Sequence, residues 1–128
     1  MKANSVFQIT DWNETPVDES TPKVVRGTFY MTFTGELEGK AEMAQLKIYF
    51  DDSHAQMFGM TRFIGKLKDK EGSFVFKDDG EFKNGVVTTK WTIIEGSGTA
   101  DLKGISGEIN LVTEGKPKFD IELNYEIN

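Results

Sequence analysis

The sequence has no cysteine, a single histidine and only three prolines among its 128 residues. Without cysteine, disulfide bonds, thiolate nucleophiles, cysteine-ligated zinc and iron–sulfur clusters are all excluded. Runs of about 18 consecutive apolar residues are also missing, which excludes a membrane-spanning helix. Because the first residues contain no apolar segment of the kind that a signal peptide requires, we expect a soluble cytoplasmic protein with no membrane partner.

Positive charge is scarce as well. Lysine and arginine together number 15 against 21 aspartates and glutamates, which gives a formal net charge of −6. The lysines are interspersed with acids, so the sequence predicts no basic stripe. Such a surface would repel phosphate groups, and nucleic acid is therefore not an expected partner.

No stretch has the periodicity of an amphipathic helix, and apolar residues alternate with polar residues instead. The clearest case lies near the C-terminus, where five apolar side chains recur at every second position: Phe119, Ile121, Leu123, Tyr125 and Ile127. Side chains of a strand point alternately to its two faces, so this pattern predicts one wall of a core. The ranges 29–33, 44–50, 74–76 and 87–93 have the same pattern, with Leu46 and Ile48 predicted to point inward.

Short turn-forming segments separate these runs. Asn84-Gly85 is the strongest hairpin signal, because both residues tolerate a positive φ. Segment 96–98 (GSG) is predicted to connect adjacent strands rather than to bind phosphate, and the polar segment 14–22 to be an exposed loop. About eight strands with short turns predict an all-β fold, a closed antiparallel β-barrel with little or no helix. The length favours a single domain over residues 1–128.

Several motifs, spread in order over nearly the whole chain, carry a family resemblance. They are Trp12 with Glu14 and the segments 35–39 (GELEG), 61–65 (TRFIG), 72–76 (GSFVF), 91–94 (WTII) and 96–99 (GSGT). This ordered set resembles the uncharacterised bacterial domain of unknown function family 3224. The resemblance implies a closed β-barrel of the allene-oxide-cyclase-like kind and no established activity. Where many members carry a histidine shortly after the Phe-Val pair, this sequence has Asp78.

Aromatic side chains supply the candidate ligand-binding residues, which are Phe63, Phe74, Phe76 and Trp91. In a small barrel such a cluster can line a pocket for one apolar ligand, with the indole N–H of Trp91 as a polar contact. The alternative is a packed core with no pocket. The leading hypothesis is a barrel that binds a small apolar ligand in its interior or mouth, without a cofactor.

Two carboxylates are weaker candidates for catalysis. Glu42 continues the predicted inward face of Ala44 and Leu46, and Asp78 continues that of Phe74 and Phe76. If both point into an apolar barrel, desolvation raises their pKa values and makes them acid–base groups of a cofactor-independent cyclase or isomerase. The alternative places both at solvated strand ends, with a β-bulge reversing the face at Asp78.

The outer face of the sheet suggests a third function, which is a homo-oligomeric interaction module without small-molecule chemistry. Met60, Ile64, Tyr30 and Tyr49 are predicted to be apolar side chains on otherwise polar outer faces. Arg62 is also predicted to point outward, either into a subunit interface or into solvent.

Segment 51–54 (DDSH) contains the one histidine and three further oxygen-bearing side chains. Such a composition can bind a divalent metal, but a zinc site normally draws ligands from more than one segment. The same residues suit a polar hairpin turn, and we predict a turn and no metal site.

Overall fold

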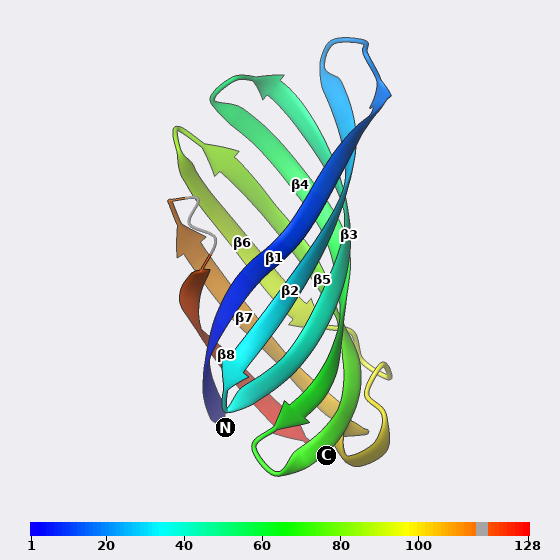
Figure 1. The fold of residues 1–128 in the computed structure, drawn as a ribbon, viewed down its shortest axis with the longest axis vertical. Coiled ribbons are helices and arrows are strands. Elements are labelled where there is room, and N and C mark those ends of the chain that lie inside the picture. The colour runs from blue at the N-terminus through cyan, green and yellow to red at the C-terminus, as the bar shows by residue number, and fades with distance from the viewer. Residues whose placement is uncertain (115–117) are drawn as a thin grey trace.

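The computed structural model describes residues 1–114 and 118–128. Eight antiparallel strands form a closed barrel in which each strand pairs with its neighbours in sequence and β8 pairs with β1 (Figure 1). The strands are β1 (Lys2–Asp18), β2 (Lys23–Gly35), β3 (Leu37–Asp51), β4 (His54–Leu67), β5 (Lys70–Lys83), β6 (Val86–Ile93), β7 (Ile105–Thr113) and β8 (Lys118–Ile127). A single turn of 3-10 helix, η1 (Ala100–Leu102), lies between β6 and β7. The predicted fold class is confirmed.

No helix within the described ranges is long and apolar enough to cross a lipid bilayer. The tightest predicted turn is also confirmed: Asn84 and Gly85 join β5 to β6 with φ values of 52° and 84°. Positive φ at both central residues is the geometry that matches the twist of a two-residue hairpin.

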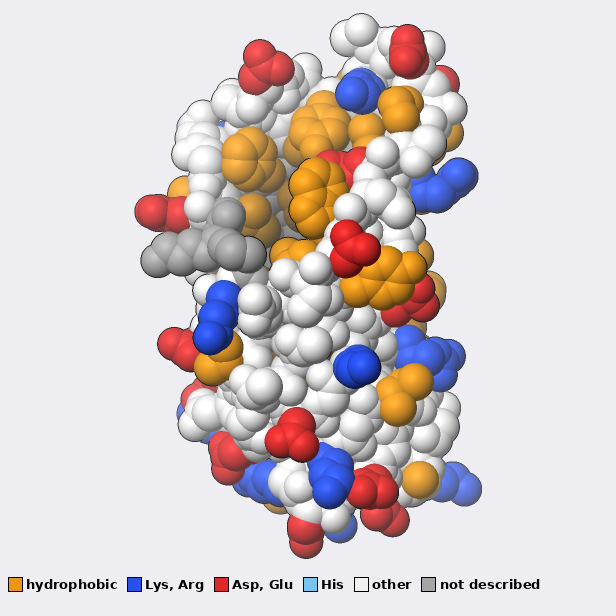
Figure 2. All heavy atoms as spheres, in the orientation of Figure 1, with side chains coloured by type: hydrophobic (Ala, Val, Ile, Leu, Met, Phe, Trp, Pro, Cys, Tyr) orange, Lys and Arg blue, Asp and Glu red, His pale blue; other side chains and the backbone are white. Residues whose placement is uncertain are grey.

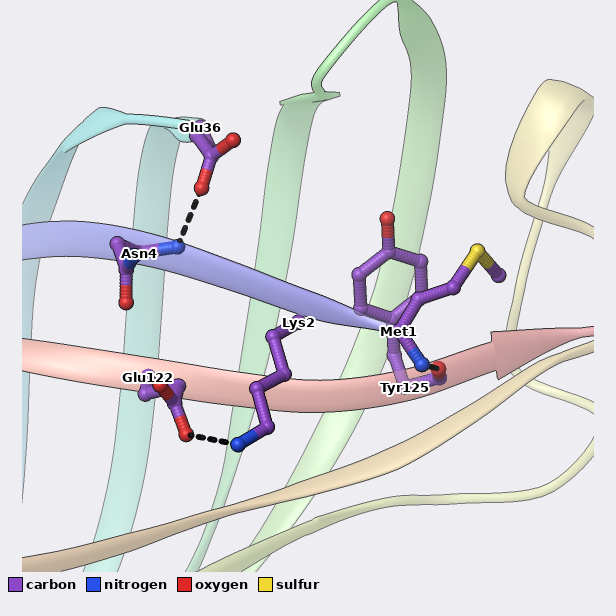
Figure 3. A network of polar contacts seen from close by, with 6 residues as sticks. All are labelled: Met1, Lys2, Asn4, Glu36, Glu122 and Tyr125. Atoms are coloured by element: carbon purple, nitrogen blue, oxygen red, sulfur yellow. Dashed lines mark hydrogen bonds and ion pairs between the residues drawn. The ribbon is translucent and has the colours of Figure 1, made fainter.

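Both chain ends lie at the same end of the barrel (Figure 1). The amino group of Met1 donates a hydrogen bond to the carbonyl of Tyr125 at 2.9 Å, and the backbone N–H of Asn4 donates to Oε1 of Glu36 at 2.9 Å (Figure 3). These contacts tie the start of β1 to β8 on one side and to the β2–β3 turn on the other. This end of the barrel is therefore hydrogen-bonded on both sides of its first strand.

The same end is filled by aromatic rings. Phe33, Phe63, Phe74 and Phe76 are fully buried, and their rings pack in sequence at centroid distances of 5.5 Å, 5.1 Å and 5.1 Å. Each buried phenylalanine stabilises the fold by roughly 1.5–3 kcal/mol relative to an exposed one. We call this half of the barrel the closed half.

The β6–β7 connection covers the floor of the closed half. Leu102 of η1 is fully buried. Ser97 accepts a hydrogen bond from the backbone N–H of Val75 at 3.0 Å and donates one to the carbonyl of Ile94 at 2.6 Å. The glycine-rich segment 96–98 thus joins adjacent strands, as predicted, but as a cap that lies against β5 rather than as a tight turn.

The face of β3 that points inward was predicted wrongly. Met43 and Gln45 are buried, whereas Leu46 is 49% exposed. Both faces of β3 carry apolar residues, so alternation alone does not choose between them. The register with β4, which sets Met43 opposite the buried Thr61, decides the face. As a result Tyr49 lines the interior instead of the predicted outer surface.

The predicted loop 14–22 is also wrong in its first part. β1 continues to Asp18 and pairs with β2, with Glu14 opposite Gly27 and Thr15 opposite Arg26. This stretch is mostly exposed and polar on both faces, so it lacks the alternation that identifies a strand.

Candidate functional site

The half of the barrel away from the chain ends is hollow, and we call it the open half. It contains a cavity of about 670 Å³. Figure 2 shows the hollow in the upper part of the view with hydrophobic side chains gathered around it. The apolar wall is drawn mainly from Phe7, Phe29, Met57, Trp91, Leu111 and Phe119.

Strand pairing explains why this half is open. Among the described residues, β7 pairs with β8 only over residues 105–108, and β1 pairs with β8 only as far as Gln8. Beyond those points β7 pairs only with β6, and β1 pairs only with β2. β1 and β2 rise together past the other strands (Figure 1). The inward side chains of this half therefore line a space instead of meeting in the centre.

Trp91 of β6 separates the two halves. The centre of its ring lies 5.6 Å from the ring centre of Phe76 in the closed half. It lies 5.2 Å from the ring centre of Phe7, which lines the cavity. Phe7 in turn packs edge-to-face with Phe119, with 4.1 Å between the ring centres. Trp91 is only 4% exposed. The indole is therefore at once the last layer of the core and the floor of the cavity.

Asp78 of β5 lies directly opposite Trp91 in the β5–β6 register and also lines the cavity. The β4–β5 register runs without a shift, so the inward face of Phe74 and Phe76 continues to Asp78 as predicted. The side chain is 5% exposed. Burial raises the pKa of its carboxyl group from 3.8 to about 6, and the nearby Gln45 amide opposes this rise.

Two buried oxygens near this floor make no hydrogen bond with the described part of the chain. They are Oδ1 of Asp78 and Oγ1 of Thr61. Asp78 is paired with Gly59, two residues before Thr61 on β4, so the two polar side chains occupy diagonal positions on the inner face. An unpaired buried polar atom costs about 1–3 kcal/mol, and each one calls for a specific explanation.

The mouth of the cavity combines aromatic rings with an ion pair. Nζ of Lys47 lies 3.4 Å from Oε2 of Glu14 and 5.9 Å from the centre of the Phe29 ring. The hydroxyl of Tyr49 donates a long hydrogen bond of 3.5 Å to the same Glu14 oxygen. Trp12 stacks on Phe29 with 6.2 Å between ring centres. Lys47 is thus held at the rim by Glu14 and by the faces of neighbouring rings.

Comparison with known proteins places the chain in a family. The family model described as a protein of unknown function, DUF3224, matches residues 3–125. The chain belongs to the DUF3224 family. The resemblance seen in the sequence motifs is therefore confirmed.

A crystal structure of a DUF3224 protein of unknown function from Shewanella oneidensis MR-1 shares the fold of this DUF3224 protein. The TM-score is 0.79 at 21% sequence identity, with 100% of this chain and 98% of that chain covered. At this identity the likeness establishes the fold alone. Comparison with curated proteins gave no match.

The four aromatic residues predicted to bind a ligand are divided between the two halves of the DUF3224 barrel. Phe63, Phe74 and Phe76 are fully buried in the closed half and do not line the cavity. Only Trp91 reaches it. The alternation of each strand predicted that these residues face inward, but it carries no information on their height along the barrel axis, and height decides between core and cavity.

The two predicted carboxylates are also separated. Asp78 lies on the cavity floor, whereas Glu42 is exposed on the outer face, where it is paired with Tyr30 and Arg62. The inward prediction for Glu42 was wrong because it depended on the reversed face of β3. Glu42 instead raises the pKa of the Tyr30 hydroxyl by accepting its hydrogen bond and by its charge.

Segment 51–54 forms the β3–β4 turn. Oδ1 of Asp51 accepts hydrogen bonds from the backbone N–H and the hydroxyl of Ser53 at 2.8 Å and 2.9 Å. His54 faces Glu81 at 3.7 Å. Within residues 1–114 and 118–128, no group of three or more His, Asp or Glu side chains is arranged to hold a metal ion.

Sequence reasoning missed the residues at the mouth of the DUF3224 cavity, above all Phe29, Lys47 and Tyr49 as a group. Trp12 and Glu14 were noted only as family motifs. Extension of β1 past position 14 brings Glu14 to Lys47 and Tyr49, which are 33 and 35 residues away in sequence. Only the correct face of β3 together with that extension would have revealed the cluster.

Proposed function

We propose that this protein binds a small, largely apolar molecule in the open half of its barrel. The observation that carries the proposal is a cavity of about 670 Å³ with an apolar wall and a buried carboxyl group on its floor. Ligand sites of proteins are concave, mostly apolar spaces of roughly 300–1,000 Å³ with a few polar groups that fix orientation. The cavity has this size and this composition.

The contrast with the closed half supports the proposal. There, inward rings fill the interior and touch one another, as close packing in protein cores requires. In the open half, rings of similar size stand around a space, and Trp12 at its rim remains 57% exposed. Apolar side chains that face a water-accessible space favour ligand binding, because a ligand that covers them removes apolar surface from water.

Filling the cavity from within tests the proposal. N-phenyl-1-naphthylamine, an uncharged apolar dye that becomes fluorescent in apolar surroundings, serves as the probe. Ala55 is fully buried and lines the cavity. We expect Ala55→Phe to weaken dye binding by about tenfold or more, because the new ring occupies the site of the dye.

Ala44→Phe is the matched control, since Ala44 lies on the outer face of the neighbouring strand β3. We expect this variant to bind the dye as the unaltered protein does. Equal binding by both variants, or no binding by the unaltered protein, would contradict the proposal.

A second candidate function is a cofactor-independent isomerase or cyclase, and the placement of Asp78 favours it. A buried carboxylate with a pKa of about 6 is suited to accept and return a proton near neutral pH. The Asp78 carboxylate would take a proton from an activated C–H group of the bound substrate and deliver it to another atom of the same molecule.

Deuterium exchange into an apolar ketone such as tetralone, followed by NMR in D₂O, tests this chemistry. Loss of a general base reduces such a rate by about 10²–10⁴-fold. We expect Asp78→Asn to remove the protein-dependent exchange and the exposed neighbour Asp79→Asn to retain it. Exchange that is unchanged in Asp78→Asn excludes Asp78 as the base.

A homo-oligomer through the outer face of the sheet is the third candidate. Met60 and Ile64 are 59% and 61% exposed, and the exposed Phe58 lies opposite Leu46 in the β3–β4 register. Tyr49 no longer belongs to this surface because it points inward. Light scattering, which measures the mass in solution, tests this candidate. We expect Met60→Asp to lower that mass. If the unaltered protein is a monomer at high concentration, the candidate is ruled out.

A further inference from the structure

The floor of the cavity places a carboxylate beside an aromatic face. Asp78 and Trp91 are directly opposed cross-strand neighbours whose side chains both point inward. Side chains in such a pair have Cβ atoms roughly 4.5–5.5 Å apart. On the other flank of Asp78, the paired residue of β4 is Gly59, which has no side chain. A Cβ at Gly59 would lie 2.7 Å from Oδ1 of Asp78, so the carboxyl group leans over Gly59 and fills that space, with the indole on its other side.

Oδ1 of Asp78 has no hydrogen-bond donor in the described part of the chain, although the residue is 95% buried. The buried polar side chains of the other strands near the cavity floor are Gln45 of β3, Thr61 of β4 and Thr89 of β6. None of these carries a positive charge. A donor or cation that enters the cavity would give this carboxyl group a charge-assisted partner that the described chain does not supply.

The charged side chains on the cavity wall are mainly acidic. The described wall carries three carboxyl groups, those of Asp11, Glu14 and Asp78, and a single amino group, that of Lys47. Lys47 is bound by Glu14 at the mouth. The whole chain has a formal net charge of −6. This field attracts cations toward the cavity and repels acidic ligands such as fatty acids.

From these observations we infer that the ligand is a lipophilic amine whose protonated nitrogen lies between the Asp78 carboxylate and the indole face of Trp91, with its apolar body against the wall. A carboxylate supplies a charge-assisted hydrogen bond, and an indole is the most favourable aromatic face for a cation. The inference rests on the proposed function, because it names the ligand class of the same cavity.

Three naphthyl compounds of similar shape and different charge provide the test: naphthylethylamine, naphthylethanol and the anion of naphthylacetic acid. Their affinities are measured by calorimetry at neutral pH. We expect the amine to bind about tenfold more tightly than the alcohol, and the acid to bind least. Asp78→Asn should bind the amine about tenfold more weakly than the unaltered protein does, and its affinity for the alcohol should be unchanged. Asp79→Asn, which removes the same charge from the adjacent exposed position, should bind all three as the unaltered protein does.

The pH dependence of the unaltered protein supplies a second measurement that requires no variant. Protonation of Asp78 below about pH 6 removes the charge that the amine recognises, so amine affinity should fall there by about tenfold in total, the same loss as in Asp78→Asn, while alcohol affinity stays constant. Asp11, Glu14, Lys47 and Tyr49 line the same cavity nearer the mouth. These four groups are present in both the unaltered protein and Asp78→Asn, so only the difference between the two profiles reports on Asp78.

The outcomes separate the two proposals. Equal affinity for amine and alcohol, with no effect of Asp78→Asn or of pH, overturns the amine inference and leaves the apolar ligand site standing. Tighter binding of the acid also overturns it. Failure of all three compounds and of the uncharged dye to bind overturns both.

Discussion

The two halves of this barrel are built from the same strands with the same alternation, yet one is solid and the other is hollow. In the closed half, β8 bridges β1 and β7, and Phe33, Phe63 and Phe74 meet in the centre. In the open half β7 no longer pairs with β8, and β1 pairs with β2 alone. The aromatic rings of this half therefore line the wall of a cavity. The comparison shows that in this barrel the extent of strand pairing, more than the identity of the inward residues, separates core from cavity.

The largest expected difference between the halves is the cost of removing a ring. Phe63→Ala deletes a fully buried ring of the closed half, where neighbours on all sides prevent collapse, and should cost about 3–5 kcal/mol of unfolding free energy. Phe119→Ala removes a half-buried ring that lines the cavity and should cost markedly less, about 1–2 kcal/mol. Urea unfolding of both variants measures the difference. Equal costs would mean that the open half is packed as tightly as the closed half.

The second prediction concerns the buried carboxylate at the boundary. The pKa of Asp78 is raised in the folded protein, so the folded state binds the proton more tightly than the unfolded state. Its favourable contribution is complete below about pH 4 and is lost as pH rises through about 6. The difference between a pKa of 3.8 and a pKa of about 6 corresponds to about 3 kcal/mol as an upper value. Relative to the unaltered protein, Asp78→Asn should therefore gain stability progressively from about pH 4 to about pH 8.

Urea unfolding across that pH range provides the measurement, with Asp79→Asn as the control because Asp79 is exposed next to Asp78. The charge of Asp79 is the smallest of the causes that act on the pKa of Asp78, so the stability of the control relative to the unaltered protein should change little with pH. A difference between Asp78→Asn and the unaltered protein that is constant with pH would show that Asp78 is not desolvated.

Local patterns were sufficient to predict the barrel but not to predict its two halves. The alternation of Phe119 through Ile127 and the Asn84-Gly85 turn are short-range signals, and both gave correct elements. β3 carries apolar side chains on both faces, so its orientation depends on the register with β4, which is non-local. That single ambiguity reversed the placement of Glu42 and Tyr49.

The cavity itself depends on where β7 stops pairing with β8 and on how far β1 extends, and neither has a local sequence signal. Asp78 and Trp91 were predicted from the inward faces of their own strands, and the structure brings them together. Phe63, Phe74 and Phe76 were assigned the correct face, but they lie in the closed half and do not line the cavity. Alternation specifies whether a side chain points into or out of the barrel. Its position along the barrel axis depends on the shear of the whole barrel.

The smallest expected effect tests the boundary between the halves at Thr61. Its hydroxyl is fully buried and makes no hydrogen bond with the described part of the chain. Thr61→Val replaces that hydroxyl with a methyl group of similar size, so the variant should be more stable by about 1 kcal/mol. Thr88→Val, at an exposed position of β6, should change stability by less than about 0.5 kcal/mol. Destabilisation of Thr61→Val in urea unfolding would show that the hydroxyl is hydrogen-bonded in solution, and the boundary would then be reached by water rather than belong to the dry core of the closed half.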